Sequence, residues 1–391
     1  MLNTPFSPWP SYSEEEAEAV RAVILSNRVN YWTGDQCRLF EEEFATWAGC
    51  QHAVALANGT VALDVALQAL GIGAGDEVVV TPRTFLASAS CVVNAGAVPV
   101  FADIDRDSQN ITAETIRQVI TPRTRAIICV HLAGWPCDMD PIMALADEFG
   151  LKVIEDCAQA HGASYKGRPV GSIGHVGAWS FCQDKIMTTG GEGGMVTTND
   201  RELWSAMWSF KDHGKSWEAV YQREHPPGFR WLHESFGTNW RMIEMQAAIG
   251  RIQLRRMAEW HAARLANAQR IWQLVERLAG LRAPQPADGI VHAAYKCYVF
   301  VEPQRLSPGW SRDRIIQEVM VAGVPCYAGS CSEIYLERAF EDTGWRPRER
   351  LVVARELGET SLMFLVHPTL SADEIEKTCS VLQAVMARAV H

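Results

Sequence analysis

The sequence predicts an α/β protein built on a mainly parallel β-sheet that helices cover on both faces. Between residues 50 and 235, short apolar runs of strand length alternate with segments whose apolar residues have helical spacing. The strand runs, such as TRAIICVHL at 124–132, are apolar almost throughout, which is typical of strands buried on both faces. A chain of 391 residues, 48% of them hydrophobic, can bury a large core, so two domains or one large domain with an appendage are expected.

Two helices are expected before the sheet. The segment SEEEAEAVRAVILSN at 13–27 opens with a serine and glutamates, which is a usual helix start. The segment TGDQCRLFEEEFATWAG at 33–49 reads as a second helix that stops at its glycine. The sheet then begins with residues 52–82, which predict a strand, a turn at 58–60, a helix and a second strand.

The same alternation continues to residue 199. Further strands are expected at 98–105, 124–132, 151–160, 177–181 and 193–199, with helices at 112–120 and 139–150. Strands that are joined through helices pair in parallel, so the order of the elements also favours a mainly parallel sheet.

A long helix and a second, smaller region follow the sheet. The helical pattern at 242–280 lacks a strict heptad, so a helix that links two domains is expected rather than a coiled coil. Strand and helix patterns at 295–303, 312–326 and 371–390 then indicate a smaller α/β domain. We therefore predict a large domain at 1–250, N-terminal helices included, and a linking helix with a small C-terminal domain at 251–391.

Composition excludes several classes of function. The formal net charge of −10 argues against a broad basic face for nucleic acid. No apolar run approaches the roughly 18–20 residues of a membrane span, and the first residues lack the pattern of a secretory signal. The eleven cysteines include no C-x-x-C pair, so neither a metal site nor a disulfide framework is expected. A reduced, cytoplasmic protein is the expectation.

Two motifs stand where strands end, the edge at which open α/β sheets bind ligands. Gly59 and Thr60 follow a strand and begin a helix, whose free N–H groups suit a phosphate; a tight turn with a threonine cap is the structural alternative. Glu155 and Asp156 end an apolar strand, and Gln159 and His161 follow within one turn or loop. Such a carboxylate can keep a cofactor's ring nitrogen protonated, or it can cap a helix or join an ion pair.

A single lysine lies in SFCQDKIMTTGGEGG, residues 180–194. Lys185 follows a strand that should be buried, and a partly desolvated amine is available as nucleophile and base. The glycines let backbone approach a ligand closely, and the hydroxyl of Ser180 can donate to a phosphate. A surface lysine in a flexible loop is the alternative. Asn239, just before the long helix, indicates by itself only a helix start.

Together these stretches resemble the DegT/DnrJ/EryC1/StrS family of sugar aminotransferases. The resemblance spans almost the whole chain and is carried by residues 40–85, 98–105, 153–181, 190–200 and 237–254. It implies an enzyme that depends on pyridoxal 5'-phosphate (PLP) and has the aspartate-aminotransferase fold, known as fold type I. That fold combines a large domain, with a mainly parallel sheet between helices, and a smaller C-terminal α/β domain.

The resemblance also implies a role for each matching residue. Lys185 would form the Schiff base with PLP and then move the proton during transamination, with pyridoxamine 5'-phosphate as an intermediate form of the cofactor. Asp156 would pair with the pyridinium nitrogen. The remaining cofactor contacts would come from Phe85 against the ring, Gln159 at the ring hydroxyl, Gly59, Thr60 and Ser180 at the phosphate, and Asn239 from a second subunit. A homodimer with shared active sites is therefore implied.

The implied reaction moves an amino group from glutamate to a nucleotide-linked keto-sugar, in the biosynthesis of amino sugars, O-antigen or surface polysaccharide. A 4-keto-6-deoxyhexose is the commonest substrate of the family. A 3-keto-sugar nucleotide or a cyclitol is the alternative, and a non-catalytic binding protein of the same fold is a further one. The sequence does not determine the nucleotide, the aminated carbon or the stereochemistry of the product.

The segment 213–236 is rich in aromatic and basic residues. We expect some of His213, Tyr221, Arg230 and Trp231 to contact the nucleotide diphosphate. A surface loop packed by its own aromatic side chains is the alternative.

Overall fold

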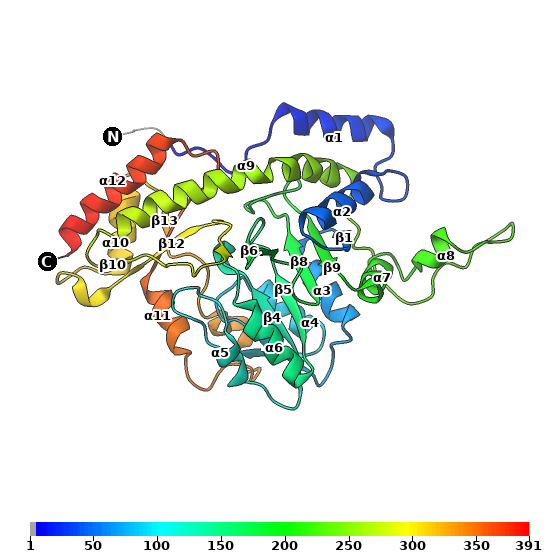
Figure 1. Cartoon of the computed structure of the whole chain (residues 1–391), viewed down its shortest axis with the longest axis horizontal. Coiled ribbons are helices and arrows are strands. Elements are labelled where there is room, and N and C mark those ends of the chain that lie inside the picture. Colours follow the sequence, from blue (N-terminus) through cyan, green and yellow to red (C-terminus); the bar gives the residue numbers. More distant parts are fainter. Residues whose placement is uncertain (1–4, 391) are drawn as a thin grey trace.

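The computed structural model describes residues 5–390, and its centre is a seven-stranded sheet in the order β1-β9-β8-β5-β4-β2-β3 (Figure 1). These strands are β1 (His52–Leu56), β2 (Glu77–Val80), β3 (Val98–Phe101), β4 (Thr124–Val130), β5 (Lys152–Asp156), β8 (Val176–Ser180) and β9 (Gly194–Thr198). The strands from β8 to β3 pair in parallel, whereas β9 runs antiparallel to both of its neighbours. The expectation of a mainly parallel sheet is confirmed.

Helices cover both faces of this sheet, as expected. Ile128 and Val130 of β4 join the core on one face, and Ile127 and Cys129 join the core on the other, because successive side chains of a strand point to opposite faces. The first core includes side chains of α3 (Gly59–Ala69), α4 (Ala87–Asn94) and α7 (Arg201–Phe210), and the second includes side chains of α5 (Ala113–Arg117) and α6 (Met139–Phe149).

Helix α9 (Glu244–Val275) runs along the molecule and joins two cores (Figure 1). Its first half packs Leu254 and Met257 into the core of the large sheet, together with the N-terminal helix α2 (Gln36–Trp47). Its second half packs Ile271 into a separate core of the C-terminal region. The other N-terminal helix, α1 (Glu14–Ser26), also packs against α9. The expected boundary at 250/251 falls inside α9, and the division into two domains stays a prediction.

The C-terminal region is built on a four-stranded antiparallel sheet in the order β10-β12-β14-β13. Its elements are β10 (Leu281–Arg282), β12 (Cys297–Val301), β13 (Cys326–Tyr327), β14 (Ser361–Phe364), α10 (Arg312–Val321), α11 (Val352–Thr360) and α12 (Ala372–Ala389). A three-stranded sheet joins β11 (Ile290–Val291), β6 (Ser164–Tyr165) and β7 (Arg168–Pro169), and short 3-10 turns occur at Leu132–Gly134, Pro303–Arg305, Ile334–Leu336 and Arg338–Phe340. The helices α4, α7 and α11 and the strand β14 are among the elements absent from the sequence expectations.

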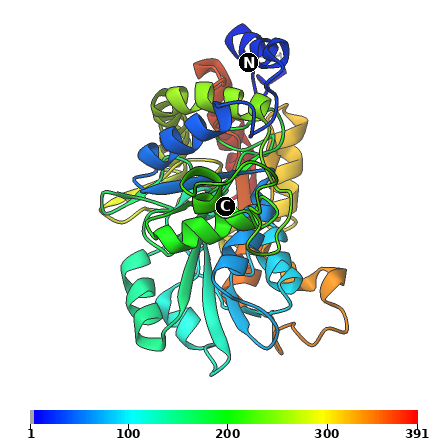
Figure 2. The same ribbon diagram turned by 90° about the vertical axis from the view of Figure 1, so that its right-hand side faces the viewer.

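Between α7 and α9 the chain forms an arm that extends away from the body of the molecule (Figure 1), and Figure 2 views the molecule from the side on which the arm projects. The arm carries the short helix α8 (Trp217–Tyr221). Beyond α8 it exposes the large apolar side chains of Phe229, Trp231 and Phe236, the last almost completely. Within residues 5–390, no helix combines the length and the apolar character that crossing a bilayer requires.

Candidate active site

A cavity of about 780 Å³ opens at the carboxyl ends of the parallel strands. It gathers side chains from elements that are far apart in the sequence, as the crossovers of a parallel sheet require. Every residue expected at the cofactor except Asn239 lines it: Gly59, Thr60, Phe85, Asp156, Gln159, Ser180 and Lys185. The loops after β2, β5 and β8 and the start of α3 therefore meet in one place.

Asp156 is the last residue of β5, and its side chain is buried at the cavity wall. One carboxylate oxygen accepts a hydrogen bond from the Ser88 hydroxyl at 2.8 Å, and the other accepts one from the Ala158 N–H at 3.1 Å. Burial raises the pKa of Asp156, although these hydrogen bonds and the charge of Lys185 act in the opposite direction. A buried carboxylate with only two donors retains capacity to accept from a ligand.

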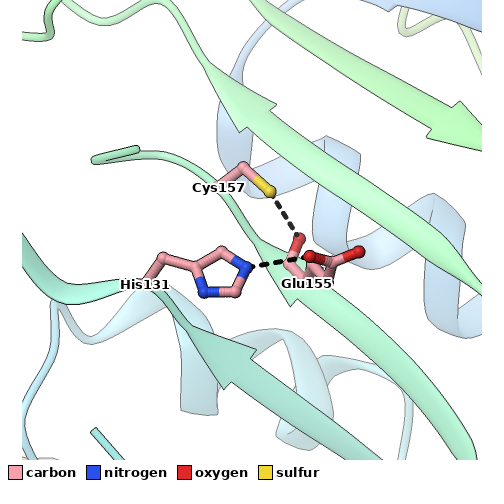
Figure 3. A group of neighbouring side chains, drawn as sticks. All are labelled: His131, Glu155 and Cys157. Atoms are coloured by element: carbon pink, nitrogen blue, oxygen red, sulfur yellow. Dashed lines mark hydrogen bonds and ion pairs between the residues drawn. The ribbon is translucent and has the colours of Figure 1, made fainter. Parts of the chain in front are cut away.

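Glu155, one residue earlier on β5, lies on the opposite face and is fully paired. Its carboxylate accepts from the N–H groups of Ile173 and Gly174 at 2.8 and 2.6 Å, and from Gly171 at 2.9 Å. His131 Nε2 lies 3.0 Å from the same carboxylate (Figure 3). Burial alone would raise the pKa of Glu155, but His131 and the backbone donors outweigh it and hold that pKa below the ordinary value.

The trio His131, Glu155 and Cys157 brings three possible metal ligands within 4.8 Å of one another (Figure 3). His131 Nδ1 accepts from the Cys137 N–H at 2.9 Å, so Nε2 carries the proton and donates to Glu155. The Cys157 thiol lies 3.6 Å from the Glu155 carbonyl oxygen. Both ring nitrogens and both carboxylate oxygens thus have protein partners, and we assign this buried trio a structural role: it fixes β5 beside Asp156.

The start of α3 forms a cradle for an anion. Asn58 caps the helix by accepting from the Val61 N–H at 3.0 Å, which leaves the first N–H groups at the cavity. A Cβ atom at Gly59 would lie 2.5 Å from the Cβ of Ser180 and 2.8 Å from its hydroxyl oxygen. Only glycine therefore allows the helix start to approach Ser180 this closely.

Lys185 lies half-buried at the cavity wall, with Nζ 5.3 Å from the centroid of the Tyr295 ring. Its backbone is held on both sides: its N–H donates to the Cys182 carbonyl at 3.1 Å, and its carbonyl accepts from Trp9 Nε1 at 2.8 Å. The neighbouring Asp184 accepts from the Tyr295 hydroxyl. Burial raises the pKa of Asp184, but Lys185, that hydroxyl and Lys296 outweigh it and lower the pKa overall.

Two further side chains that were expected at the cofactor, Phe85 and Gln159, also line the cavity. Phe85 lines the cavity with 71% of its surface exposed, so its ring is available to pack against a planar ligand. Gln159 is buried, and its side-chain oxygen accepts from the Ala133 N–H at 2.8 Å. That bond fixes the amide and leaves its nitrogen as the group that can donate to a ligand.

The structure does not bring the expected substrate residues, or Asn239, to this cavity. Asn239 is exposed and bridges to Asp212 through backbone pairing. Tyr221 packs against Trp217, with ring centroids 4.4 Å apart, as the self-packed alternative predicts. The exposed residues His213, Arg230 and Trp231 lie on the segment that includes the projecting arm. The expected roles of these residues therefore remain predictions.

Sequence reasoning missed other residues that line the cavity. Ser88 orients Asp156, and its hydroxyl also lies 2.9 Å from that of Thr84. Tyr295, Lys296 and Ser330 come from the C-terminal region and form the wall that faces the large sheet. The stretch YKCYVF at 295–300 does place a polar pair just before an apolar strand, and this is the signal that could have identified it.

Comparisons with known proteins agree with this geometry. The sequence pattern of the DegT/DnrJ/EryC1/StrS aminotransferase family matches residues 10–383. The X-ray structure of an aminotransferase from Psychrobacter cryohalolentis is 64% identical and has a TM-score of 0.97, covering 98% of this chain and 99% of that one. GDP-perosamine synthase from Caulobacter vibrioides is 38% identical over 355 residues, 89% of each chain. The UDP-N-acetyl-3-dehydro-alpha-D-glucosamine 3-aminotransferase of Acidithiobacillus ferrooxidans is 36% identical over 355 residues, 90% of this chain and 89% of that one.

The fold and these likenesses define the class: the protein is an aminotransferase of fold type I, the fold of PLP-dependent aminotransferases. Within that class the chain belongs to the DegT/DnrJ/EryC1/StrS aminotransferase family. Solved structures of similar fold include the PLP form and the pyridoxamine 5'-phosphate form of a sugar aminotransferase from Streptococcus pneumoniae, each 25% identical to this chain. The alternative of a non-catalytic binding protein is therefore set aside.

Proposed function

We propose that this enzyme uses PLP to move an amino group from glutamate to a nucleotide-linked 4-keto-6-deoxyhexose, in the cytoplasmic biosynthesis of an amino sugar for surface polysaccharide such as O-antigen. One observation carries the proposal: Lys185, Asp156 and the N-terminus of α3 line the same cavity. The similarity to a GDP-perosamine synthase supports the choice of substrate class.

The side chains at the cavity fit PLP. The glycine cradle at Gly59 and Ser180 suits its phosphate, and the under-paired carboxylate of Asp156 suits a protonated ring nitrogen. The exposed face of Phe85 suits the ring, and the Gln159 amide suits the ring hydroxyl. When bound, PLP supplies an electron sink that lets an amino group leave one carbon and join another.

Each residue then has a definite task. Asp156 keeps a proton on the ring nitrogen, because a buried carboxylate beside a cation is most stable as an ion pair. Lys185 would hold the cofactor through Nζ, and once the amino donor had displaced it, its free amine would take up and return the proton at the substrate carbon. The first turn of α3 and Ser180 anchor the phosphate, so the reacting atoms stay beside Lys185.

We also propose a homodimer in which the arm serves the partner's active site. The arm exposes three large apolar side chains and keeps Asn239, Arg230 and Trp231 away from its own cavity. A surface of this kind is typical of a protein interface. Complementation tests the idea: inactive Lys185→Ala and Asn239→Ala chains should recover activity when they are co-expressed. Recovery is absent if each chain completes its own site.

A 3-keto-sugar nucleotide is the second candidate substrate, since a UDP-linked 3-aminotransferase is nearly as similar as the GDP-perosamine synthase. Two measurements test the function and distinguish the two candidate substrates. The visible spectrum of the purified protein should show a cofactor band that disappears when glutamate is added. Mass spectrometry of reactions with GDP-linked 4-keto and UDP-linked 3-keto sugars then identifies the aminated product. A protein that shows no band after incubation with PLP would contradict the proposal.

A further inference from the structure

A second, smaller cavity of about 330 Å³ adjoins the candidate active site. Asp184, Tyr295 and Lys296 line both cavities, so the two share a wall. The second cavity is closed by the N-terminal segment 6–9, by helix α9 and by residues 365–367. Trp9 of the N-terminal segment donates to the Lys185 carbonyl, which places this cavity directly beside the lysine.

Arg264 of α9 lines the second cavity, and no anionic side chain in the described part of the chain pairs with its guanidinium. The residue is 1% exposed, and within residues 5–390 neither Nε nor Nη2 has a hydrogen-bond partner. Its Nη1 makes one long contact of 3.5 Å with the Tyr295 carbonyl, and the guanidinium lies over the Trp9 ring at 4.8 Å. Burial lowers the pKa of Arg264 to about 9, against the charges of Tyr295 and Asp184. A buried guanidinium with unused donors is costly unless an anion joins it.

The other charged groups at this cavity leave it short of negative charge. Burial lowers the pKa of Lys296 to about 8, and the charges of Arg264 and Lys185 act in the same direction while Asp184 opposes them. Burial also lowers the pKa of His367 to about 4, with Arg264 and Lys296 contributing, so the imidazole is neutral at pH 7. The single carboxylate among the lining residues, Asp184, already accepts from Tyr295 and lies 4.0 Å from Lys296.

We propose that this cavity binds a carboxylate of the amino donor, with Arg264 and Lys296 as its recognition residues. The planar fork of Arg264 suits a carboxylate, and Lys296 extends from the shared wall toward both cavities. The proposal rests on the aminotransferase function proposed above and adds the residues that select a dicarboxylic amino acid. The cavity of about 330 Å³ is smaller than the cavity of about 780 Å³ that Lys185 lines, and the two share a wall, so a donor whose carboxylate lies here is next to that lysine.

Glutarate provides a direct test, because it has both carboxylates of glutamate but no amino group to react. Titration calorimetry of the PLP-loaded full-length enzyme should show glutarate binding, and butyrate should bind at least about 10-fold more weakly. The substitution Arg264→Gln should weaken glutarate binding by about 10- to 100-fold, the effect of losing a charge-assisted hydrogen-bond pair. Lys296→Met, at a wall position, gives a second variant if Arg264→Gln does not fold.

The matched control is Arg270→Gln on the same helix, whose side chain is 47% exposed and pairs with Glu376 at 2.8 Å. It should bind glutarate like the wild type. In steady-state assays, Arg264→Gln should raise the KM for glutamate and leave the KM for the sugar nucleotide unchanged. Unchanged glutarate binding in both cavity variants would overturn the proposal. Weaker binding of pyrophosphate, with glutarate unaffected, would also overturn it and assign the cavity to phosphate.

The failure of this proposal and the failure of the proposed function are distinguishable. If the enzyme aminates a keto-sugar from glutamate but glutarate does not bind, the function stands and the carboxylate site is wrong. If glutarate binds through Arg264 but no keto-sugar is aminated, the carboxylate site stands and the sugar reaction is wrong.

Discussion

Glu155 and Asp156 are adjacent carboxylates on one buried strand, yet the protein treats them in opposite ways. Glu155 receives three backbone N–H groups and the His131 ring, and its pKa is lowered. Asp156 receives two donors, faces the cavity, and its pKa is raised. The difference teaches that a buried charge with a complete set of partners holds the fold, whereas one left short of partners is prepared for a ligand.

Arg264 extends the same contrast to a cation. Another buried guanidinium, that of Arg83, donates from Nε to Gln109 at 2.9 Å and from Nη2 to Ser361 at 2.9 Å, and so ties the large sheet to the C-terminal region. Arg264 has only one long contact. Within residues 5–390, Arg83 leaves only Nη1 without a hydrogen-bond partner, whereas Arg264 leaves both Nε and Nη2 without one. Burial by itself therefore does not mark a functional residue. At Arg264 the inference rests on two unused donor groups together with the cavity that the residue lines.

The largest expected effect comes from a substitution at Asp156, the carboxylate that faces the cavity. Asp156→Ala should keep some PLP but lower kcat by about 10²- to 10³-fold, because the ring nitrogen then loses the carboxylate that keeps it protonated. Cofactor content is measured by absorbance and kcat by product formation. Ser88→Ala, which removes one of the two donors to Asp156, serves as the milder variant. Turnover of Asp156→Ala near that of the wild type would rule out the assigned role.

The next effect concerns stability and should have opposite signs at the two carboxylates. Glu155→Gln should lower the free energy of unfolding of the cofactor-free protein by about 3 kcal/mol, since an amide cannot accept from all of the donors that surround Glu155. Asp156→Asn should leave that free energy unchanged or raise it by about 1 kcal/mol, because it removes a buried charge that is short of partners. Urea unfolding at pH 7 measures both.

The pH dependence of the free energy of unfolding should also differ between Glu155 and Asp156. The pKa of Glu155 is lower in the folded state than its ordinary 4.5, so its stabilisation is complete above about pH 4.5 and is lost as the pH falls through the folded value. The pKa of Asp156 is raised above 3.8, so its ionised form destabilises the cofactor-free protein, and this effect disappears as the pH falls through the raised value. Urea unfolding of Glu155→Gln and Asp156→Asn at several pH values measures both effects. If the two substitutions changed the pH dependence of the free energy of unfolding in the same direction, the contrast between the two carboxylates would be contradicted.

The sequence predicted the seven strands of the large sheet and the helices α3, α5 and α6, because long runs of apolar residues determine which segments are buried, but it did not predict α4 or α7. It also placed Asp156 at the end of a strand and Lys185 after one; in the structure β5 ends at Asp156, and Lys185 lies in the loop that follows β8. It could not separate Glu155 from Asp156, since alternation puts them on opposite faces without saying which face holds the cavity. The short strand β14 and helix α11 were missed because tertiary contacts, more than local pattern, define such elements.

The sequence alone could not identify Arg264 as a candidate binding residue. Residues 251–277 contain several arginines with similar surroundings in the sequence. Only the fold brings Trp9 and Tyr295 around Arg264 while Arg270 stays at the surface beside Glu376. The sequence could not identify Lys296 either, because the two cavities that this residue lines are formed by segments from both ends of the chain.

A smaller effect is expected at the phosphate cradle. Gly59→Ala should weaken PLP binding by about 10-fold, because the added Cβ would meet Ser180 at 2.5 Å and push the start of α3 away. Gly73→Ala is the matched control, since its Cβ would meet only a carbonyl oxygen at 3.7 Å. Fluorescence titration of the cofactor-free variants with PLP measures the affinity. Equal affinities for the two variants would show that the close approach at Gly59 is not needed.

The smallest expected effect concerns the arm, which is proposed to serve the active site of a second chain. Arg230 is exposed on the arm, and it is one of the expected contacts to the nucleotide diphosphate. Arg230→Ala should raise the KM for the sugar nucleotide by up to about 10-fold and leave both the KM for glutamate and the free energy of unfolding unchanged, because an exposed charge contributes little to the fold. Arg21→Ala, at an exposed pair with Glu18, is the control. An unchanged KM in Arg230→Ala would exclude this contact and favour the alternative of a self-packed surface loop.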